Sequence, residues 1–283
     1  MTVWEERISG GSDALLLGEH RVRYGWTRPV MATAGTWCDL GCGTAAASSS
    51  ALGDVLPERV VLTDAEPDAL AEATRAFAPR DVEASTIDLT SNAALSQLAD
   101  RLAGGQGPVV ITCFEVIEHL SDFVPVIEWL TAMAADGATV AISVPNDVFT
   151  AVKNPFHVTM WGSSTVAELR DLLPADHVVA SQVALSGSVI SSGRAVDLSE
   201  RIAATTDAVP LQYLMGFGPE ADRFAPNAVV MPTDVAAQRV WERQREVDNA
   251  YYRTEAGAVA ALRERVAALE AELAVARSGQ GIA

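Results

Sequence analysis

Long apolar segments are missing from this 283-residue sequence. Its apolar stretches have the length of strands, well below the roughly 20 residues that a membrane-spanning helix needs, so we expect no transmembrane segment. The first residues lack a basic region followed by an apolar core, which is the pattern of a secretory signal. We therefore expect a cytoplasmic protein.

Cysteine and lysine are scarce. Cys38, Cys42 and Cys113 are the only cysteines and lie in apolar segments without zinc-ligand spacing, so neither a disulfide framework nor a structural zinc site is expected. Lys153 is the single lysine, and 20 basic residues stand against 37 acidic ones, for a net charge of −17. Because such a surface repels phosphate backbones, a nucleic-acid partner is not expected.

What the sequence does contain is an alternation of short apolar runs and helical patterns from about residue 36 to 185. This alternation is typical of βαβ units that build a parallel sheet, so it predicts an α/β fold. The predicted strands lie near 36–40, 60–64, 83–88, 109–114, 139–144 and 177–185. The predicted helices lie at about 44–53, 67–77, 91–103, 121–135 and 163–173.

The pattern divides the chain into an N-terminal segment (1–32), a main domain (33–232) and a C-terminal segment (233–283). After residue 185 the alternation breaks. Residues 186–227 contain an expected helix at 196–206 and an aromatic run at 213–219, and we interpret them as an insertion that shapes a substrate pocket. Residues 228–231 could supply a last strand.

The C-terminal segment has the pattern of one long helix. An apolar seam steps along it by three and four residues, which is compatible with a short coiled coil and predicts a homo-oligomer. A helix that packs on its own domain is the alternative. The seam residues are Val259, Leu262, Val266, Leu269 and Leu273.

A glycine turn follows the first predicted strand. Gly41 and Gly43 come directly after Asp39-Leu40 and before a helix. Glycine permits positive φ and a close approach of the backbone to a ligand, and the N-terminus of the next helix offers free N–H groups. The pattern indicates a nucleotide-binding turn, although an ordinary tight strand-to-helix turn would look the same.

Two carboxylates end the next two predicted strands. Asp64 lies where an acid can accept hydrogen bonds from both ribose hydroxyls of a bound nucleoside. Asp88 lies where the amino group of an adenine could donate to it. The order of these signals supports a nucleotide cofactor more strongly than any one of them.

Acidic and imidazole side chains follow the fourth predicted strand. Glu115, Glu118 and His119 come at the carboxyl end of a parallel strand, where doubly wound sheets place their chemistry. Histidine has a pKa suited to a general base near neutral pH, so His119 is the predicted base, with Glu118 beside it. The alternatives are that His119 only hydrogen-bonds a loop and that Glu118 is an ordinary acid at a helix N-terminus.

A third group follows the fifth predicted strand, which ends in Pro145-Asn146. His157 and Trp161 lie beyond that end, where a sugar could stack on the indole and hydrogen-bond to the imidazole. His157 is therefore a further candidate catalytic residue.

The glycine turn and the carboxylates resemble those of the class I S-adenosylmethionine (SAM) dependent methyltransferases, over roughly residues 33–185. The resemblance implies a Rossmann-like seven-stranded sheet with an antiparallel last strand, SAM over the glycine turn and methyl transfer by direct displacement at sulfur. It also implies that cofactor-binding residues occupy the matching positions, which are Asp39, Gly41, Gly43, Asp64, Asp88 and Glu115. Ala45 replaces the third glycine that is often present, and the missing glycine disfavours a nicotinamide dehydrogenase.

The string E-V-I-E-H-L at 115–120 is similar to small-molecule and sugar O-methyltransferases, and N-P-F-H-V at 154–158 resembles bacterial methyltransferases of glycan synthesis. We therefore expect methylation of a hydroxyl on a sugar, glycan intermediate or small metabolite. Glu115, Glu118, His119 and His157 also match the Mg²⁺ or Mn²⁺ ligands of RNA terminal-ribose 2′-O-methyltransferases. A metal-dependent RNA enzyme, or a catalytically silent subunit that acts through its C-terminal helix, are the alternatives.

Overall fold

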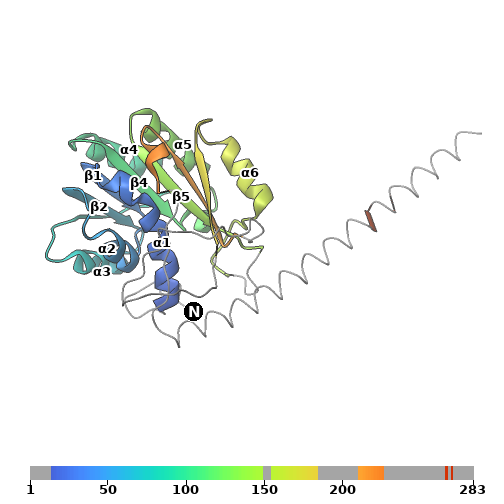
Figure 1. The fold of residues 1–283 in the computed structure, drawn as a ribbon, viewed down its shortest axis with the longest axis horizontal. Helices are drawn as coiled ribbons and strands as arrows, with labels where there is room; N and C mark the ends of the chain where they lie inside the picture. The colour runs from blue at the N-terminus through green and yellow to red at the C-terminus, as the bar shows by residue number, and fades with distance from the viewer. Residues whose placement is uncertain (1–13, 149–153, 184–209, 226–264, 267–268, 270–283) are drawn as a thin grey trace, which may run out of the picture.

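The computed structural model describes residues 14–148, 154–183, 210–225, 265–266 and 269. They form a seven-stranded sheet in the order β3-β2-β1-β4-β5-β7-β6 (Figure 1). β1 to β5 are parallel, and β7 is antiparallel to both β5 and β6. The strands are β1 (Thr36–Leu40), β2 (Arg59–Asp64), β3 (Glu83–Thr86), β4 (Val109–Phe114), β5 (Thr139–Pro145), β6 (Val178–Gln182) and β7 (Gln212–Phe217).

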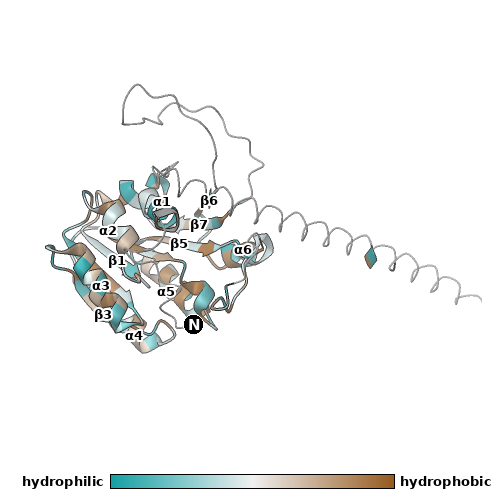
Figure 2. Ribbon diagram, turned by 90° about the horizontal axis from the view of Figure 1, so that it is seen from below, coloured by the Kyte–Doolittle hydropathy of each residue, from teal (hydrophilic) through white to brown (hydrophobic). Residues whose placement is uncertain are grey.

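Helices cover both faces of the sheet (Figure 2). The hydrophobic cluster on one face includes residues of α1 (Ala14–Met31), α2 (Ala46–Leu52) and α3 (Pro67–Phe77). The cluster on the other face includes residues of α4 (Asn92–Ala103), α5 (Val124–Ala135) and α6 (Ser163–Asp171). Among the described helices, none is long and apolar enough to cross a bilayer.

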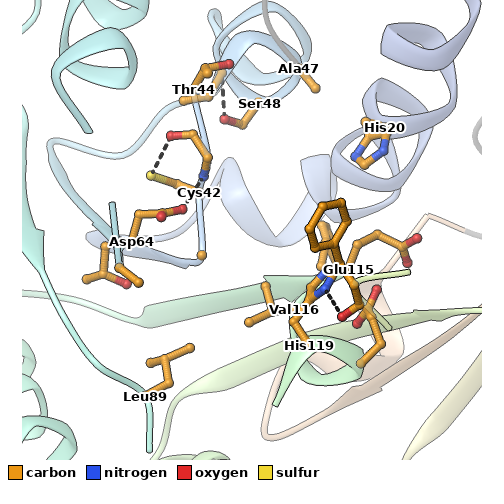
Figure 3. A pocket seen from close by; sticks show the side chains of 18 of the residues that line it. His20, Cys42, Thr44, Ala47, Ser48, Asp64, Leu89, Glu115, Val116 and His119 are labelled. Carbon is orange, nitrogen blue, oxygen red and sulfur yellow. Dashed lines mark hydrogen bonds between the residues drawn. The ribbon is translucent and has the colours of Figure 1, made fainter. Parts of the chain in front are cut away.

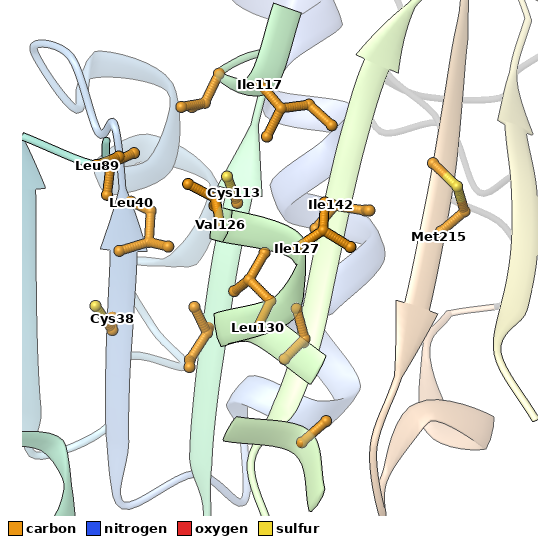
Figure 4. Packing of buried hydrophobic residues seen from close by; sticks show 14 of the residues in the cluster. Cys38, Leu40, Leu89, Cys113, Ile117, Val126, Ile127, Leu130, Ile142 and Met215 are labelled. Atoms are coloured by element: carbon orange, nitrogen blue, oxygen red, sulfur yellow. The ribbon is translucent and has the colours of Figure 1, made fainter. Parts of the chain in front are cut away.

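The central strands are apolar on both sides because each side is covered by helices. Successive side chains of a strand point to opposite faces, so Trp37 joins the cluster under α1 while Cys38 joins the cluster under α5. Figure 4 shows side chains of α5, such as Ile127, packed over β4 and β5. This packing explains why these strands appear in the sequence as continuous apolar runs.

The predicted α/β alternation is confirmed between residues 36 and 183, with differences of a few residues at element ends. The last strand is a correction. It is formed by Gln212–Phe217, so the aromatic run belongs to the sheet and its interpretation as part of an insertion is wrong. The run returns antiparallel between β5 and β6, a pairing distant in sequence that the local pattern does not reveal. Residues 228–231 lie outside the described residues.

The helix α1 belongs to the same folded unit as the sheet, although its residues fall in the predicted N-terminal segment. Trp26 stacks on Phe224 with ring centroids 4.3 Å apart, and Met31 is completely buried. In the predicted C-terminal helix only three residues are described, and the seam residues Val266 and Leu269 are exposed there. The coiled coil and the oligomer stay predictions, and the helix expected at 196–206 lies outside the described residues.

Candidate active site

A cavity of about 680 Å³ opens at the carboxyl ends of β1, β2 and β4 (Figure 3). The glycine turn forms one part of its wall, the segment after β4 another, and α1 a third. This is the edge of the sheet at which the sequence predicts the site. The candidate residues that line it are Gly41, Gly43, Asp64, Asp88, Glu115, Glu118, His119 and His157.

The glycine turn has the backbone conformation that the sequence predicts. Gly41 and Gly43 have φ of 66° and 55°, in the left-handed region that glycine adopts without strain. A Cβ atom on Gly41 would lie 2.5 Å from a methyl carbon of Val116, whereas one on Gly43 would meet no atom within 4 Å. Gly41 therefore serves close packing against the segment after β4, while Gly43 leaves the cavity side of the turn open.

Asp64 is fixed at the edge of the cavity. Its carboxylate accepts hydrogen bonds from the backbone N–H groups of Gly43, at 2.8 Å, and Glu66, at 3.0 Å. Asp88 lies two residues past the end of β3, and its Oδ1 accepts from the backbone N–H and the hydroxyl of Thr90. Both acids line the cavity, and their contact with a cofactor stays a prediction.

Asp39 does not line the cavity. It is completely buried, and its carboxylate accepts hydrogen bonds from Thr112 Oγ1 at 2.6 Å and from the Tyr24 hydroxyl at 3.0 Å. Burial raises the pKa of Asp39 to about 7, against the lowering effect of these two hydrogen bonds. Asp39 thus ties α1 to β1 and β4 beneath the glycine turn.

The segment after β4 begins with a strained residue. Glu115 has φ of 55°, which a residue with a Cβ atom seldom adopts and which is found mainly at functional sites. Its carboxylate accepts a hydrogen bond from Ser143 Oγ at 2.9 Å. The hydroxyl oxygen of Ser143 in turn accepts a hydrogen bond from the backbone N–H of Glu115. Ser143 on β5 therefore holds Glu115 in place.

Glu118 follows in a short 3₁₀ helix (Ile117–His119) and is completely buried. Neither of its carboxylate oxygens has a hydrogen-bond partner among the described residues. Burial raises the pKa of Glu118 well above its usual range, and the charge of Glu115 adds to the rise.

Two histidines lie beside Glu118. The ring centroids of His119 and His157 are 5.1 Å apart, and one ligand atom each from Glu118, His119 and His157 lies within 4.8 Å of the others. His119 Nδ1 is 3.1 Å from the carbonyl oxygen of Phe156, which is an acceptor, so Nδ1 carries the proton of the neutral ring. The lone pair of that tautomer is then on Nε2.

Asp147 is a site residue that the sequence reading missed. Its Oδ1 is 2.6 Å from His157 Nδ1, and its Oδ2 accepts the backbone N–H of Trp161 at 2.8 Å. The backbone N–H groups of Val158 and Thr159 donate to the carbonyl of Glu118 and bring this loop against the segment after β4. The sequence feature that could have indicated Asp147 is its place directly after Pro145-Asn146, at the end of a strand.

The predicted role of Trp161 in stacking on a sugar is wrong. Trp161 is completely buried and packs on Phe123, with ring centroids 5.2 Å apart, so it cannot stack on a sugar in the cavity. The sequence shows that an indole follows a strand end but not the direction in which it points. Three residues of α1, Glu19, His20 and Tyr24, line the cavity without having been predicted there, because α1 carries no recognisable motif.

Residues 19–181 match a family model described as "Methyltransferase domain". The chain belongs to this methyltransferase family. Its sheet, with β7 antiparallel, is the one expected for class I SAM-dependent enzymes. A comparison with curated protein sequences finds no match.

Among solved structures, the small RNA methyltransferase HEN1 is similar, with 19% identity and a TM-score of 0.50. The match covers 80% of this chain and 28% of the length of HEN1, and it shows a shared fold. The methyltransferase domain of bacterial CtHen1-C has 18% identity and a TM-score of 0.45 over 71% of this chain and 98% of that domain. The N-methyltransferase NodS from Bradyrhizobium japonicum WM9 has 15% identity and a TM-score of 0.44 over 73% and 98%.

Proposed function

We propose that this methyltransferase transfers a methyl group to a hydroxyl of a sugar, glycan intermediate or small metabolite, and that it uses a divalent cation held by Glu115, Glu118, His119 and His157. The observation that carries the proposal is Glu118. A buried carboxylate with two unsatisfied oxygens is costly, and a bound cation removes that cost.

The donor set fits a hard divalent cation. Carboxylate oxygen and imidazole nitrogen suit Mg²⁺ or Mn²⁺, and one such atom each of Glu118, His119 and His157 lies within 4.8 Å of the others. Asp147 orients His157 and the carbonyl of Phe156 orients His119, which is how supporting groups fix histidine ligands in metal sites. The chemistry that such an ion supplies is a lowered pKa for an acceptor hydroxyl.

In methyl transfer to oxygen, the new C–O bond forms as the C–S bond of SAM breaks, and the hydroxyl loses its proton. When His119 Nε2 is not a metal ligand it accepts that proton, and when it is a ligand the proton passes to solvent water. The acceptor would lie against the segment after β4, beside the methyl group of SAM held over the glycine turn.

The charge of the cavity supports a sugar or small metabolite over RNA. The described residues that line it include Glu19, Asp64, Asp88, Glu115 and Glu118 but no lysine or arginine. Phosphate backbones are bound mainly by such cations, and the whole chain carries a net charge of −17. An RNA terminal ribose is the second candidate, since the same four side chains could serve it.

The test is incubation of the full chain with methyl-labelled SAM and cell extract separated into lipid, glycan, nucleic-acid and small-molecule pools. Each reaction is run with EDTA and after addition of Mn²⁺ or Mg²⁺. We expect label in the glycan or small-molecule pool and only with the cation. Label in the nucleic-acid pool would select the RNA candidate, and label independent of cation would contradict the metal site.

Glu118→Gln tests the ligand directly, with Glu128→Gln on the exposed face of α5 as the matched control. Titration with Mn²⁺ alone should show a loss of at least about 100-fold in affinity for the first variant and none for the second. A chain that binds SAM but labels no pool under any condition would instead favour the silent subunit.

A further inference from the structure

His20 is a histidine of α1 that has no role in the proposed function so far. It lines the cavity and is partly buried. Its ring forms no hydrogen bond with any other described residue, and neither ring nitrogen is buried. The other two lining histidines differ, since His119 Nδ1 contacts the carbonyl of Phe156 and His157 Nδ1 contacts Asp147. Both ring nitrogens of His20 are therefore available to a ligand in the cavity.

Two contacts of α1 place His20 in the wall beside β4. Tyr24 lies one helical turn after His20 on the same face of the helix, and its ring packs edge-on against Phe114 at the end of β4, with centroids 5.1 Å apart. The carbonyl of Glu19 accepts a hydrogen bond at 3.2 Å from Gln182 Nε2, at the end of β6. The helix thus crosses the carboxyl ends of β6, β7, β5 and β4, and Figure 3 shows His20 beside the segment after β4.

His20 is neutral at pH 7. Burial lowers its pKa well below the usual value of a histidine, and the charge of Arg23 adds to this effect. One ring nitrogen of the neutral form carries a proton and the other has a lone pair, so the ring can accept one proton. The carboxyl groups of Glu19, Glu115 and Glu118 line the same cavity, and negative charge on them favours the protonated ring.

The proposed metal site creates a need for such a group. When His119 is a metal ligand, the lone pair of its Nε2 is no longer available to the acceptor hydroxyl. His20 does not belong to the group of possible ligands formed by Glu118, His119 and His157. Its lone pair therefore stays available while the cation is bound.

We propose that His20 takes the proton of the acceptor hydroxyl when the cation holds His119, and that it passes this proton to solvent water. The acceptor oxygen forms the new C–O bond, the electrons of the C–S bond stay on sulfur, and the hydroxyl proton moves to the unprotonated nitrogen of His20. The imidazolium then gives a proton to water and the ring is neutral again. The inference rests on the proposed methyl transfer and adds a second base to it.

The experiment compares His20→Ala with the wild-type chain. The matched control is His177→Ala, which removes an imidazole directly before β6, at the opposite edge of the sheet. Initial rates are measured with Mn²⁺, labelled SAM and a dilution series of the extract pool that the wild-type chain labels, with and without added imidazole. Calorimetry measures the binding of S-adenosylhomocysteine. Circular dichroism checks folding, and His20→Gln is measured in the same way, without imidazole, if His20→Ala does not fold.

We expect His20→Ala to lose about 10²–10⁴ of the maximal rate, to bind S-adenosylhomocysteine within about twofold of wild type, and to recover at least about tenfold with imidazole. A loss of less than about tenfold would overturn the inference. A loss that comes only from weaker binding of S-adenosylhomocysteine or of the acceptor would also overturn it, because His20 would then be a binding residue. If the wild-type chain labels no pool, the proposed function itself fails.

A second measurement needs no turnover. In chain labelled with ¹⁵N-histidine, NMR reports the protonation of each of the four histidine rings, and His→Ala variants assign the signals. At pH 7 we expect a neutral ring for His20, and we expect Mg²⁺ to shift the signals of His119 and His157 but not those of His20. A protonated His20, or a shift as large as that of His119, would overturn the inference.

Discussion

The two halves of the cavity differ in how their polar groups are satisfied. In the half predicted to hold the cofactor, Asp64 accepts two backbone hydrogen bonds and Asp88 accepts two from Thr90. The other part of the wall, which we call the acceptor half, is formed by Glu115, Glu118, His119, His157 and Gln212. There, Glu118 and Gln212 each have buried polar atoms without a partner among the described residues. Among the residues that the structure describes, the polar groups of the first half have partners, and some of those in the second do not.

This difference indicates where ligands contribute most to the site. A group that is already hydrogen-bonded can bind a ligand with little rearrangement, so the cofactor half is preorganised. A buried group without a partner destabilises the chain by about 1–3 kcal/mol, and more when it is charged, until a ligand satisfies it. Metal and acceptor should therefore stabilise the folded chain more than their contact area alone suggests.

His119→Ala should give the largest effect. If His119 acts as the base, turnover falls by about 10²–10⁴ while the affinity for Mn²⁺ and for S-adenosylhomocysteine stays near wild type. If it is a metal ligand, the affinity for Mn²⁺ falls as well. Steady-state kinetics and Mn²⁺ titration on the same preparation separate the two roles, and a fall of less than tenfold in turnover would exclude both.

Asp64→Ala should weaken binding in the cofactor half. The carboxylate is predicted to accept the ribose hydroxyls, so its removal should cost about 1.5–3 kcal/mol of affinity for S-adenosylhomocysteine. Calorimetry measures this loss, with the exposed Asp68→Ala as the control. Unchanged affinity would show that Asp64 only supports the glycine turn.

Asp147→Asn should weaken metal binding in the acceptor half and leave ligand binding in the cofactor half unchanged. The amide of the variant is a neutral acceptor and binds the Nδ1–H of His157 less strongly than the carboxylate does. We therefore expect a 10- to 100-fold loss of affinity for Mn²⁺, which is the usual effect of removing a group that supports a metal ligand. The affinity for S-adenosylhomocysteine should stay constant. Equal Mn²⁺ binding by the variant and by the exposed Asp136→Asn control would contradict the role of His157 as a ligand.

Asp39 should affect a property other than ligand binding, because it gives a slope of stability against pH. Its folded-state pKa of about 7 lies above the unfolded value of 3.8, so the folded chain binds the proton more tightly. The stability from Asp39 is present below about pH 4 and is lost as pH rises to 7, by at most about 1.4 kcal/mol per pH unit. Tyr24 stays neutral, since burial raises its pKa, and the charge of Asp64 adds to the rise at Asp39.

Urea denaturation between pH 4.5 and 7.5 measures this slope. The Asp39→Asn variant cannot ionise at this position. Its free energy of unfolding should therefore rise relative to that of the wild type as pH rises. A difference that does not change with pH would place the ionisation of Asp39 outside this range.

The glycine turn and the residues after β4 could be predicted because each is a short segment that directly follows a strand. The carboxyl ends of parallel strands lie at the same edge of the sheet, so such segments come together there. Gly41, Gly43, Glu118 and His119 are examples, and all line the cavity. The hydrogen bonds of Arg23 with Gln182 and of Asp147 with His157 could not be predicted. Each depends on a contact between segments distant in sequence, and nothing in the local pattern fixes the direction of a side chain.

The sequence by itself determined the α/β alternation, the glycine turn and the acids that follow β2, β3 and β4, because strand and helix periods and strand-end positions are local properties of the chain. Only the tertiary structure decided that Gln212–Phe217 is the antiparallel strand, that Trp161 is buried, and that His157 meets Glu118. These outcomes follow from which elements pack together, since burial and unsatisfied hydrogen bonds are properties of the assembled core rather than of any segment.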